Sequence, residues 1–139
     1  MIFLDACVLI YRYEGTRNQA DTVLDALDAA QRDSGSRVLV VSQLTRLECR
    51  VKPLRDNDLR LLALYDHFFE GVQQVALTRR VIDRATLLRA RYRLKTPDAL
   101  QVACAMDGSA PIQFVTTDQG FKRLAEPGLH VNLIVLPLP

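Results

Sequence analysis

Short apolar runs alternate with longer amphipathic segments along the whole chain. Four of the five runs lack alternating polar residues, which is typical of strands buried on both faces of a sheet. The run over residues 72–77 gives a weaker signal. The predicted strands are residues 1–4, 38–41, 72–77, 112–115 and 131–136.

Between these runs, apolar residues recur at helical spacing. The predicted helices are a short one reaching Tyr11, one over residues 17–32, one capped by Ser42 and ended near Pro53, one capped by Asp56 or Asn57 and ended by Gly71, one capped by Thr78 and reaching Tyr92, one from Thr96 to Met106, and a short one over residues 120–124. Because strands and helices alternate, we expect an α/β fold in which helices cover both faces of a mostly parallel sheet.

The sharpest local signal is Thr96-Pro97-Asp98. Threonine is a good residue for the N-cap of a helix, and proline suits the first helical position. An aspartate in the first turn interacts favourably with the positive end of the helix dipole. These three residues therefore predict a helix that starts with Thr96 as its cap.

Composition limits the classes of protein to consider. A length of 139 residues fits one domain spanning residues 1–139, which can fold without disulfides or metals. Apolar residues make up 49% and charged residues 24%, which excludes disordered, collagen-like and low-complexity chains. The net charge of only +2 excludes a chain that binds nucleic acid through bulk basic charge. Specific chemistry must come from the placement of residues.

The cysteines and the N-terminus indicate the compartment. Cys7, Cys49 and Cys104 are odd in number, widely spaced and without a CxxC pair, so we expect buried thiols rather than disulfides or a zinc site. The N-terminal apolar run has no basic region before it and is interrupted by Asp5, unlike a signal peptide. No run reaches the roughly 20 residues of a membrane span. We expect a soluble, cytoplasmic protein.

Acidic residues occur where a parallel sheet places its sites, beyond the carboxyl ends of the strands. Asp5 ends the first predicted strand, Asp118 follows the fourth, and Glu48 lies in the helix after the second. Asp98 opens a helix. Each acid alone also fits an ordinary turn, loop or helix start. Glu48 is the exception, because apolar neighbours predict that its helix is largely buried, and a buried glutamate needs a partner or a metal.

Together, these acids predict a metal site. Four carboxylates at one edge of a sheet would repel one another, and a divalent cation would offset that cost. Carboxylate oxygens without histidine suit Mg²⁺ better than zinc. The two histidines, His67 and His130, lie far from these positions in sequence, and we expect structural or solvated roles for them. A cation held in this way can activate water and stabilise a phosphodiester during displacement.

Four segments, in order, resemble the acidic signature of PIN-domain proteins, and among them the VapC-type toxins of prokaryotic toxin–antitoxin pairs. They are Met1-Ile2-Phe3-Leu4-Asp5, Ser42-Gln43-Leu44-Thr45-Arg46-Leu47-Glu48, Thr96-Pro97-Asp98-Ala99-Leu100 and Thr116-Thr117-Asp118-Gln119-Gly120-Phe121. The resemblance covers nearly the whole chain.

The resemblance implies a three-layer α/β/α sandwich with about five strands and a Mg²⁺- or Mn²⁺-dependent endoribonuclease. It also implies a small antitoxin partner that blocks the site and, in many members, a toxin homodimer. Asp5, Glu48, Asp98 and Asp118 would be the catalytic residues and metal ligands, and Thr116 would orient a carboxylate. Ala6 is a departure, because many members carry Thr or Ser there; it removes a hydroxyl near the site but no carboxylate.

Basic residues are concentrated before Asp98. This series is either a solvated helix face or a ridge that contacts RNA phosphates. Its members are Arg79, Arg80, Arg84, Arg89, Arg91, Arg93 and Lys95. Lys95 is the strongest candidate for an RNA contact because it lies three residues from Asp98, and Arg46 and Lys122 also neighbour motif acids.

Two alternative functions remain open. The chain could be a non-catalytic PIN-like module that binds RNA or protein, although it retains all four acids. It could also be another carboxylate enzyme on a doubly wound sheet. A phosphatase is disfavoured because no second aspartate lies two residues after Asp5, and no phospho-acceptor Asp with a placed Lys identifies a receiver. The apolar helices over residues 17–32 and 59–69 either pack into the core or form a groove for an antitoxin helix or a dimer contact.

Overall fold

The computed structural model describes all 139 residues. Its elements, in chain order, are β1 (Ile2–Leu4), α1 (Ala6–Glu14), α2 (Arg17–Ser34), β2 (Leu39–Ser42), α3 (Gln43–Arg55), α4 (Leu59–Gly71), β3 (Gln73–Val75), α5 (Arg79–Tyr92), α6 (Thr96–Met106), β4 (Ile112–Thr116), the 3-10 helix η1 (Gln119–Arg123) and β5 (Leu129–Leu133). None of the helices combines the length and apolar composition needed to cross a membrane.

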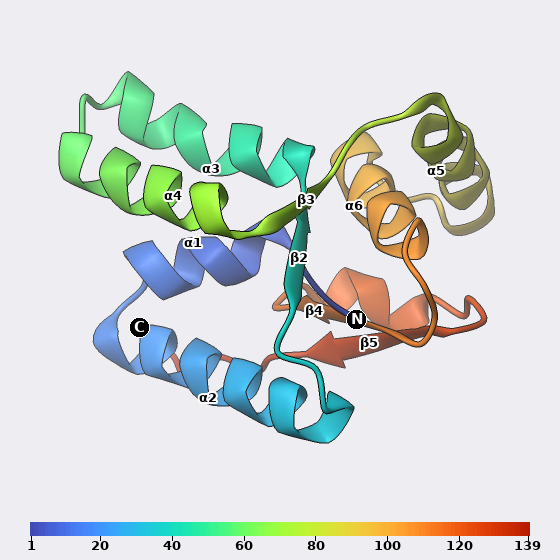
Figure 1. Cartoon of the computed structure of the whole chain (residues 1–139), viewed down its shortest axis with the longest axis horizontal. Coiled ribbons are helices and arrows are strands. Elements are labelled where there is room, and N and C mark those ends of the chain that lie inside the picture. The colour runs from blue at the N-terminus through green and yellow to red at the C-terminus, as the bar shows by residue number, and fades with distance from the viewer.

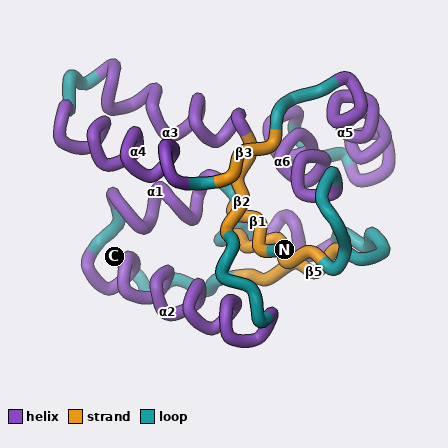
Figure 2. Tube along the Cα trace, in the orientation of Figure 1, coloured by secondary structure: helices purple, strands orange, loops and turns teal.

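The five strands form one sheet in the order β3-β2-β1-β4-β5, and all four pairings are parallel. Helices lie on both sides of it, with α1 to α4 on one side and α5 and α6 on the other (Figure 1). The tube in Figure 2 shows the strands enclosed between these two groups of helices. The predicted α/β sandwich is confirmed, and its sheet is entirely parallel.

Alternating residues of the strands supply two hydrophobic cores. Phe3 and Phe114 point to the face covered by α5 and α6, and their rings stack with centroids 5.7 Å apart. Ile2 and Leu4 point to the opposite face, where they pack with residues of α1 to α4. Phe69 is buried there and Phe68 is partly buried beside it, as the core-packing alternative for that helix predicts.

Two predicted helix N-caps are wrong, and one helix extends past its predicted end. Lys95, not Thr96, caps α6, because its carbonyl accepts the first helical hydrogen bond, from the Ala99 amide at 2.9 Å. Asp58 caps α4, since Asp56 ends α3 and Asn57 takes a left-handed conformation between the two helices. α3 also continues past Pro53 to Arg55.

The last strand begins and ends earlier than the predicted 131–136. β4 ends at Thr116, and its partner in the ladder ends opposite it at Leu133. Ile134 is buried, but it lies beyond the paired residues. Its amide still donates to the Thr116 carbonyl at 2.8 Å, and the apolar run continues to Leu136 without marking where the strand pairing ends.

Phe114 provides a test of this core. It is fully buried, stacks on Phe3 and lies 4.9 Å from the ring centroid of Phe121. Phe114→Ala would leave a cavity in the middle of the sheet and should lower the free energy of unfolding by about 3–5 kcal/mol in denaturant titrations. Leu138→Ala, at a residue that is 91% exposed, should change it by no more than about 0.5 kcal/mol. Equal effects would contradict this assignment of the core.

Candidate functional site

The sheet order places the acidic residues beside a crevice. The order reverses between the neighbouring strands β1 and β4, and ligands of open parallel sheets bind beyond the carboxyl ends of strands at such a point. Asp5 directly follows β1, and Asp118 lies two residues after the end of β4. Glu48 lies in α3, which starts at the carboxyl end of β2, and Asp98 lies in the first turn of α6.

Asp5 is buried and held by three donors. It caps α1, where its Oδ1 accepts the Ala6 amide at 2.9 Å. Its Oδ2 accepts the Thr116 hydroxyl at 2.9 Å and the Cys7 thiol at 3.2 Å. Burial raises the pKa of Asp5 above its ordinary value, the three hydrogen bonds oppose this, and the nearby Asp98 carboxylate adds to the rise.

Thr116 joins the two strand ends. Its side chain is fully buried, donates to Asp5 and accepts the Asp118 amide at 3.0 Å. A single hydroxyl therefore fixes both the Asp5 carboxylate and the backbone of the loop that carries Asp118. This is the contact to a carboxylate that the sequence resemblance implies for Thr116.

Cys7 belongs to the surroundings of Asp5 as well, which the sequence analysis missed. It is only partly buried, and its sulfur accepts the Thr117 amide at 3.4 Å while the thiol donates to Asp5. Burial raises the pKa of Cys7 to about 11, which keeps the thiol a neutral donor. The thiol lies beside Asp5 where Ala6 offers no hydroxyl. The sequence signal for this contact was the position of Cys7, which lies two residues after Asp5 in the first turn of the helix that Asp5 caps.

Glu48 is half-buried and contacts Gln101, whose Nε2 donates to its Oε1 at 3.0 Å. Burial raises the pKa of Glu48, and the carboxylates of Asp5 and Asp98 raise it further, while the Gln101 hydrogen bond lowers it.

The prediction that α3 is largely buried is wrong. Leu47 is 60% exposed and Val51 49% exposed, because the face turned inward carries Thr45, Cys49 and Pro53 instead. The buried partner of Glu48 was missed in the sequence, although Gln101 lies one helical turn after Asp98 on α6.

Asp98 is the acid that interacts with the other three. Burial raises its pKa, as does the Asp118 carboxylate, while Lys95 lowers it. Asp98 in turn raises the pKa of Asp5 and Glu48. The Asp118 side chain is exposed and accepts the Gly120 amide at 2.8 Å. Asp98 thus lies close enough to Asp5 and Glu48 to raise their pKa values, and close enough to Asp118 to have its own pKa raised.

No three His, Cys, Asp or Glu side chains lie close enough to form a ready-made metal-binding group. The donor chemistry nevertheless fits Mg²⁺, which usually keeps several waters and takes one or two carboxylates from the protein. Burial and mutual repulsion disfavour the ionised forms of Asp5, Glu48 and Asp98, and a divalent cation would offset that cost.

A cavity of about 280 Å³ opens beside two of the acids. Asp98 and Asp118 line it together with three basic residues. These are Arg93, Lys95 and Arg123. Of the three leading candidates for RNA contacts, Lys95, Arg46 and Lys122, only Lys95 lines this cavity. Arg46 places its guanidinium over the Phe69 ring, 6.0 Å from the centroid, and Lys122 is exposed but does not line the cavity.

Most of the predicted basic ridge is engaged within the protein. Four of its arginines contact acidic side chains or backbone carbonyls. The pairs are Arg80 with Asp107, Arg84 with the Met106 carbonyl, Arg89 with the Leu94 carbonyl, and Arg91 with Glu126. Arg93 and Lys95 make no such side-chain contact, and they are the two members that line the cavity.

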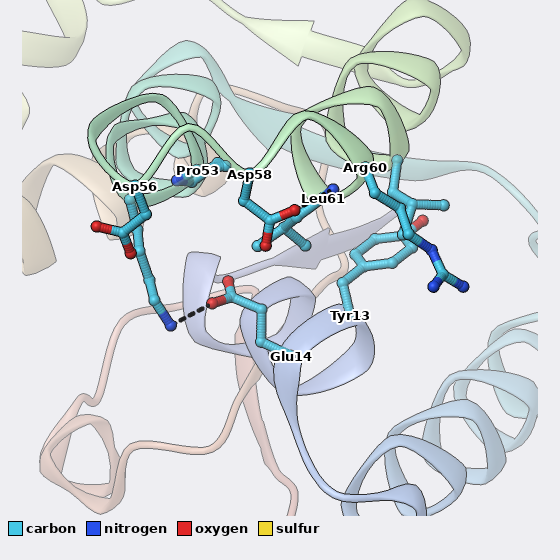
Figure 3. A pocket seen from close by; sticks show the side chains of 9 residues that line it. Tyr13, Glu14, Pro53, Asp56, Asp58, Arg60 and Leu61 are labelled. Atoms are coloured by element: carbon cyan, nitrogen blue, oxygen red, sulfur yellow. Dashed lines mark hydrogen bonds and ion pairs between the residues drawn. The ribbon is translucent and has the colours of Figure 1, made fainter.

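A separate cavity of about 390 Å³ lies between the end of α1 and the turn from α3 to α4 (Figure 3). None of the four predicted acids lines it. Its most buried acid, Glu14, accepts hydrogen bonds from the Tyr65 hydroxyl and from the Lys52 ammonium, the latter at 2.9 Å. Because Glu14 already has internal partners, this cavity is not the candidate site.

Solved structures share this fold. A toxin–antitoxin complex from Klebsiella pneumoniae contains a chain that is 21% identical, with a TM-score of 0.73, covering 94% of this chain and 96% of that one. VapBC2 from Rickettsia felis, bound to a DNA fragment from its promoter, gives 15% identity, a TM-score of 0.73 and coverage of 96% and 98%. DNA-bound VapBC from Salmonella typhimurium contains a chain that is 15% identical, with a TM-score of 0.71, covering 94% of this chain and 96% of that one. At these identities the likeness shows the fold alone.

Among curated proteins, no sequence matches the chain. Its sequence matches the PIN domain over residues 2–127, which is nearly all of its length. The chain therefore belongs to the PIN domain family.

Proposed function

We propose that this protein is a Mg²⁺-dependent endoribonuclease, with Mn²⁺ as the other suitable cation, and that it acts as the toxin of a toxin–antitoxin pair. The observation that carries the proposal is the position of Asp98. It lines one cavity together with Asp118, and its carboxylate raises the pKa values of Asp5 and Glu48, beside the crevice at the carboxyl ends of β1 and β4. Membership of the PIN domain family supports nuclease chemistry at this position.

Asp5, Glu48, Asp98 and Asp118 would hold the cation. A bound cation would supply positive charge for the phosphodiester and make water a better nucleophile. The protein's own contribution is to keep the carboxylates oriented and ionised. Thr116 and Cys7 fix Oδ2 of Asp5, and Gln101 fixes Oε1 of Glu48. A carboxylate not occupied by the cation would accept the proton of the attacking water.

The basic residues of the 280 Å³ cavity support a polyanionic substrate. Arg93, Lys95 and Arg123 lie beside Asp98 and Asp118, where a phosphate next to the cleaved bond would pass. The side chains of these residues have no hydrogen-bond or ion-pair partner within the protein, so they remain available for phosphate contacts. Arg46 and Lys122 lie outside this cavity, and we propose them only as additional RNA contacts.

The toxin assignment rests on likeness of fold. The Klebsiella pneumoniae structure is described as a toxin–antitoxin complex, and the other two as VapBC bound to DNA. We infer by analogy a small antitoxin partner, a homodimeric toxin and a cytoplasmic location for this protein.

Loss of one site carboxylate should abolish cleavage. Asp5→Asn and Asp98→Asn should each reduce Mg²⁺-dependent cleavage of a structured RNA by at least about a hundredfold, because one charge and one ligand are lost. Gel analysis of the products measures the rate. Asp25→Asn, at an exposed acid of α2, is the matched control and should cleave as wild type does. Wild-type rates in either site variant would refute the nuclease assignment.

Mg²⁺ should stabilise the fold in a pH-dependent way. Burial and repulsion raise the pKa values of Asp5, Glu48 and Asp98 above those of the unfolded chain. Between the unfolded and the raised folded values the native state binds more protons, so the free energy of unfolding falls as pH rises through that window. Above it the acids are ionised and repel one another, and a cation relieves this.

The melting temperature should therefore rise with Mg²⁺ at about pH 8 and change little near pH 4, where protons compete for the same oxygens. Thermal melting in increasing MgCl₂ measures the shift, and Asp98→Asn should reduce it at the higher pH. A shift of equal size at both pH values, or none at either, would favour the alternative of a non-catalytic PIN-like module that binds RNA or protein.

Arg93 should act in substrate binding rather than in stability. It has a positive φ of 55° at the end of α5, a conformation that glycine adopts more easily. Arg93→Gly should leave the free energy of unfolding unchanged or raise it by up to about 1 kcal/mol, yet weaken RNA binding. The slope of log affinity against log salt concentration should fall by about one.

Arg91→Ala is the matched control for Arg93→Gly. Its guanidinium already makes two contacts with Glu126, at 2.9 and 3.0 Å, so its removal should leave the salt slope unchanged. Fluorescence anisotropy with a labelled single-stranded RNA measures both variants. Equal loss of affinity in the two variants would show that general charge, and not the cavity, governs binding.

A further inference from the structure

A buried polar network lies directly behind Glu48. Gln101, which is 1% exposed, donates from Nε2 to the Thr45 hydroxyl at 2.8 Å and to Oε1 of Glu48 at 3.0 Å. Its Oε1 accepts the Ser42 hydroxyl at 2.8 Å. Ser42 and Thr45 are fully buried, and their hydroxyl oxygens lie 3.2 Å apart. Three uncharged side chains thus support one carboxylate of the site.

Regular spacing brings this network together. Ser42, Thr45 and Glu48 are three residues apart, so they run along one side of the start of α3. Ser42 also caps that helix by accepting the Thr45 amide at 3.1 Å. Asp98 and Gln101 are likewise three residues apart on α6. Gln101 joins the two helices through its hydrogen bonds to Thr45 and Glu48, and each helix carries one site acid.

The chemistry of the groups sets the orientation of the Gln101 amide. An ionised carboxylate only accepts hydrogen bonds, so the amide nitrogen must face Glu48. The amide oxygen then faces Ser42, whose hydroxyl can donate. Every buried polar side-chain atom of the chain has a hydrogen-bond partner. Oε2 of Glu48 has none, so it is open to solvent and free for a further ligand.

We propose that Gln101 is a positioning residue that holds Glu48 with one oxygen fixed and the other directed into the site. The proposal rests on the nuclease function proposed above, since it concerns the same carboxylate. Gln101 itself touches neither substrate nor cation. It acts by limiting the rotamers of Glu48, so that less conformational entropy is lost when a cation binds.

Glutamine suits this position better than its nearest alternatives. Leucine has a similar size, but it would leave the buried hydroxyls of Ser42 and Thr45 and one oxygen of Glu48 without their partner. Glutamate would place a second carboxylate against Glu48. A purely structural role for Gln101 would predict loss of stability alone, so the test must separate stability from the behaviour of Glu48.

A double-mutant cycle on Mg²⁺ binding separates them. The four proteins are wild type, Gln101→Leu, Glu48→Gln and the double variant, and MgCl₂ titrations followed by thermal melting give an apparent Kd for each. Gln101→Leu should raise the Kd about tenfold or more in the wild-type background. In the Glu48→Gln background the same change should raise it less than about twofold, because the carboxylate to be positioned is already gone.

Gln19→Leu is the matched control. Gln19 is also a buried glutamine, but it completes the capping box of α2 and donates to the Pro137 carbonyl. Its replacement should therefore lower the free energy of unfolding without changing the Mg²⁺ Kd. Equal factors for Gln101→Leu in both backgrounds would overturn the proposal. If Gln101→Leu does not fold, Thr45→Val removes one acceptor of Gln101 and should raise the Kd severalfold in the wild-type background only.

The two proposals can fail independently. RNA cleavage that survives in Asp98→Asn would remove the nuclease assignment, whatever the Mg²⁺ cycle gives. Conversely, additive Mg²⁺ effects in the cycle would remove the role of Gln101 while leaving the nuclease assignment intact. Cleavage assays at MgCl₂ near the wild-type apparent Kd add a second readout, in which Gln101→Leu should lower kcat with little change in KM, because Gln101 contacts no substrate.

Discussion

The parallel pairing of β1 with β4 is the constraint on which the site depends. Leu4 lies opposite Val115, and the Asp5 amide donates to the Val115 carbonyl at 3.0 Å, which brings Asp5 beside Thr116. Strand side chains alternate between the two faces of a sheet, so a shift of the β1 register by one residue would turn Asp5 away from Thr116. Phe3 packs on one face of the sheet and Leu4 on the other. A shift of the β1 register by one residue in either direction would therefore expose a buried apolar side chain. The hydrophobic cores therefore fix the position of a polar site.

Uncharged donors hold the buried acids, and this suits a site for a cation. Asp5 is held by a hydroxyl, a thiol and an amide, and Glu48 by the Gln101 amide. An ion pair with arginine would hold a carboxylate equally well, but it would cancel the charge that attracts the cation. Neutral hydrogen bonds keep the charge in place and leave the cost of burying it to be offset by a ligand.

The sequence predicts the parts of this molecule that depend on local pattern. The alternation of apolar runs and amphipathic segments predicts the parallel sheet with helices on both faces. The acids at the strand ends predict a site at the crevice beyond the carboxyl ends of the strands. The contacts of Cys7 and Gln101 could not be predicted, because each depends on residues brought together only by folding. The exposure of Leu47 was missed for a related reason, since helical spacing does not reveal which face of α3 turns inward.

Basic residues outnumber the acidic residues that lie outside the proposed site. The chain has 18 basic residues, and the 12 acids outside the proposed site leave an excess of six positive charges around it. Some of the basic side chains are paired internally, as Arg80 is with Asp107 and Arg91 is with Glu126, which leaves this excess unchanged. Among the basic side chains without an internal partner, Arg93, Lys95 and Arg123 line the cavity beside Asp98 and Asp118. A nearly neutral chain thus presents unpaired positive charge where a polyanion would approach the acids.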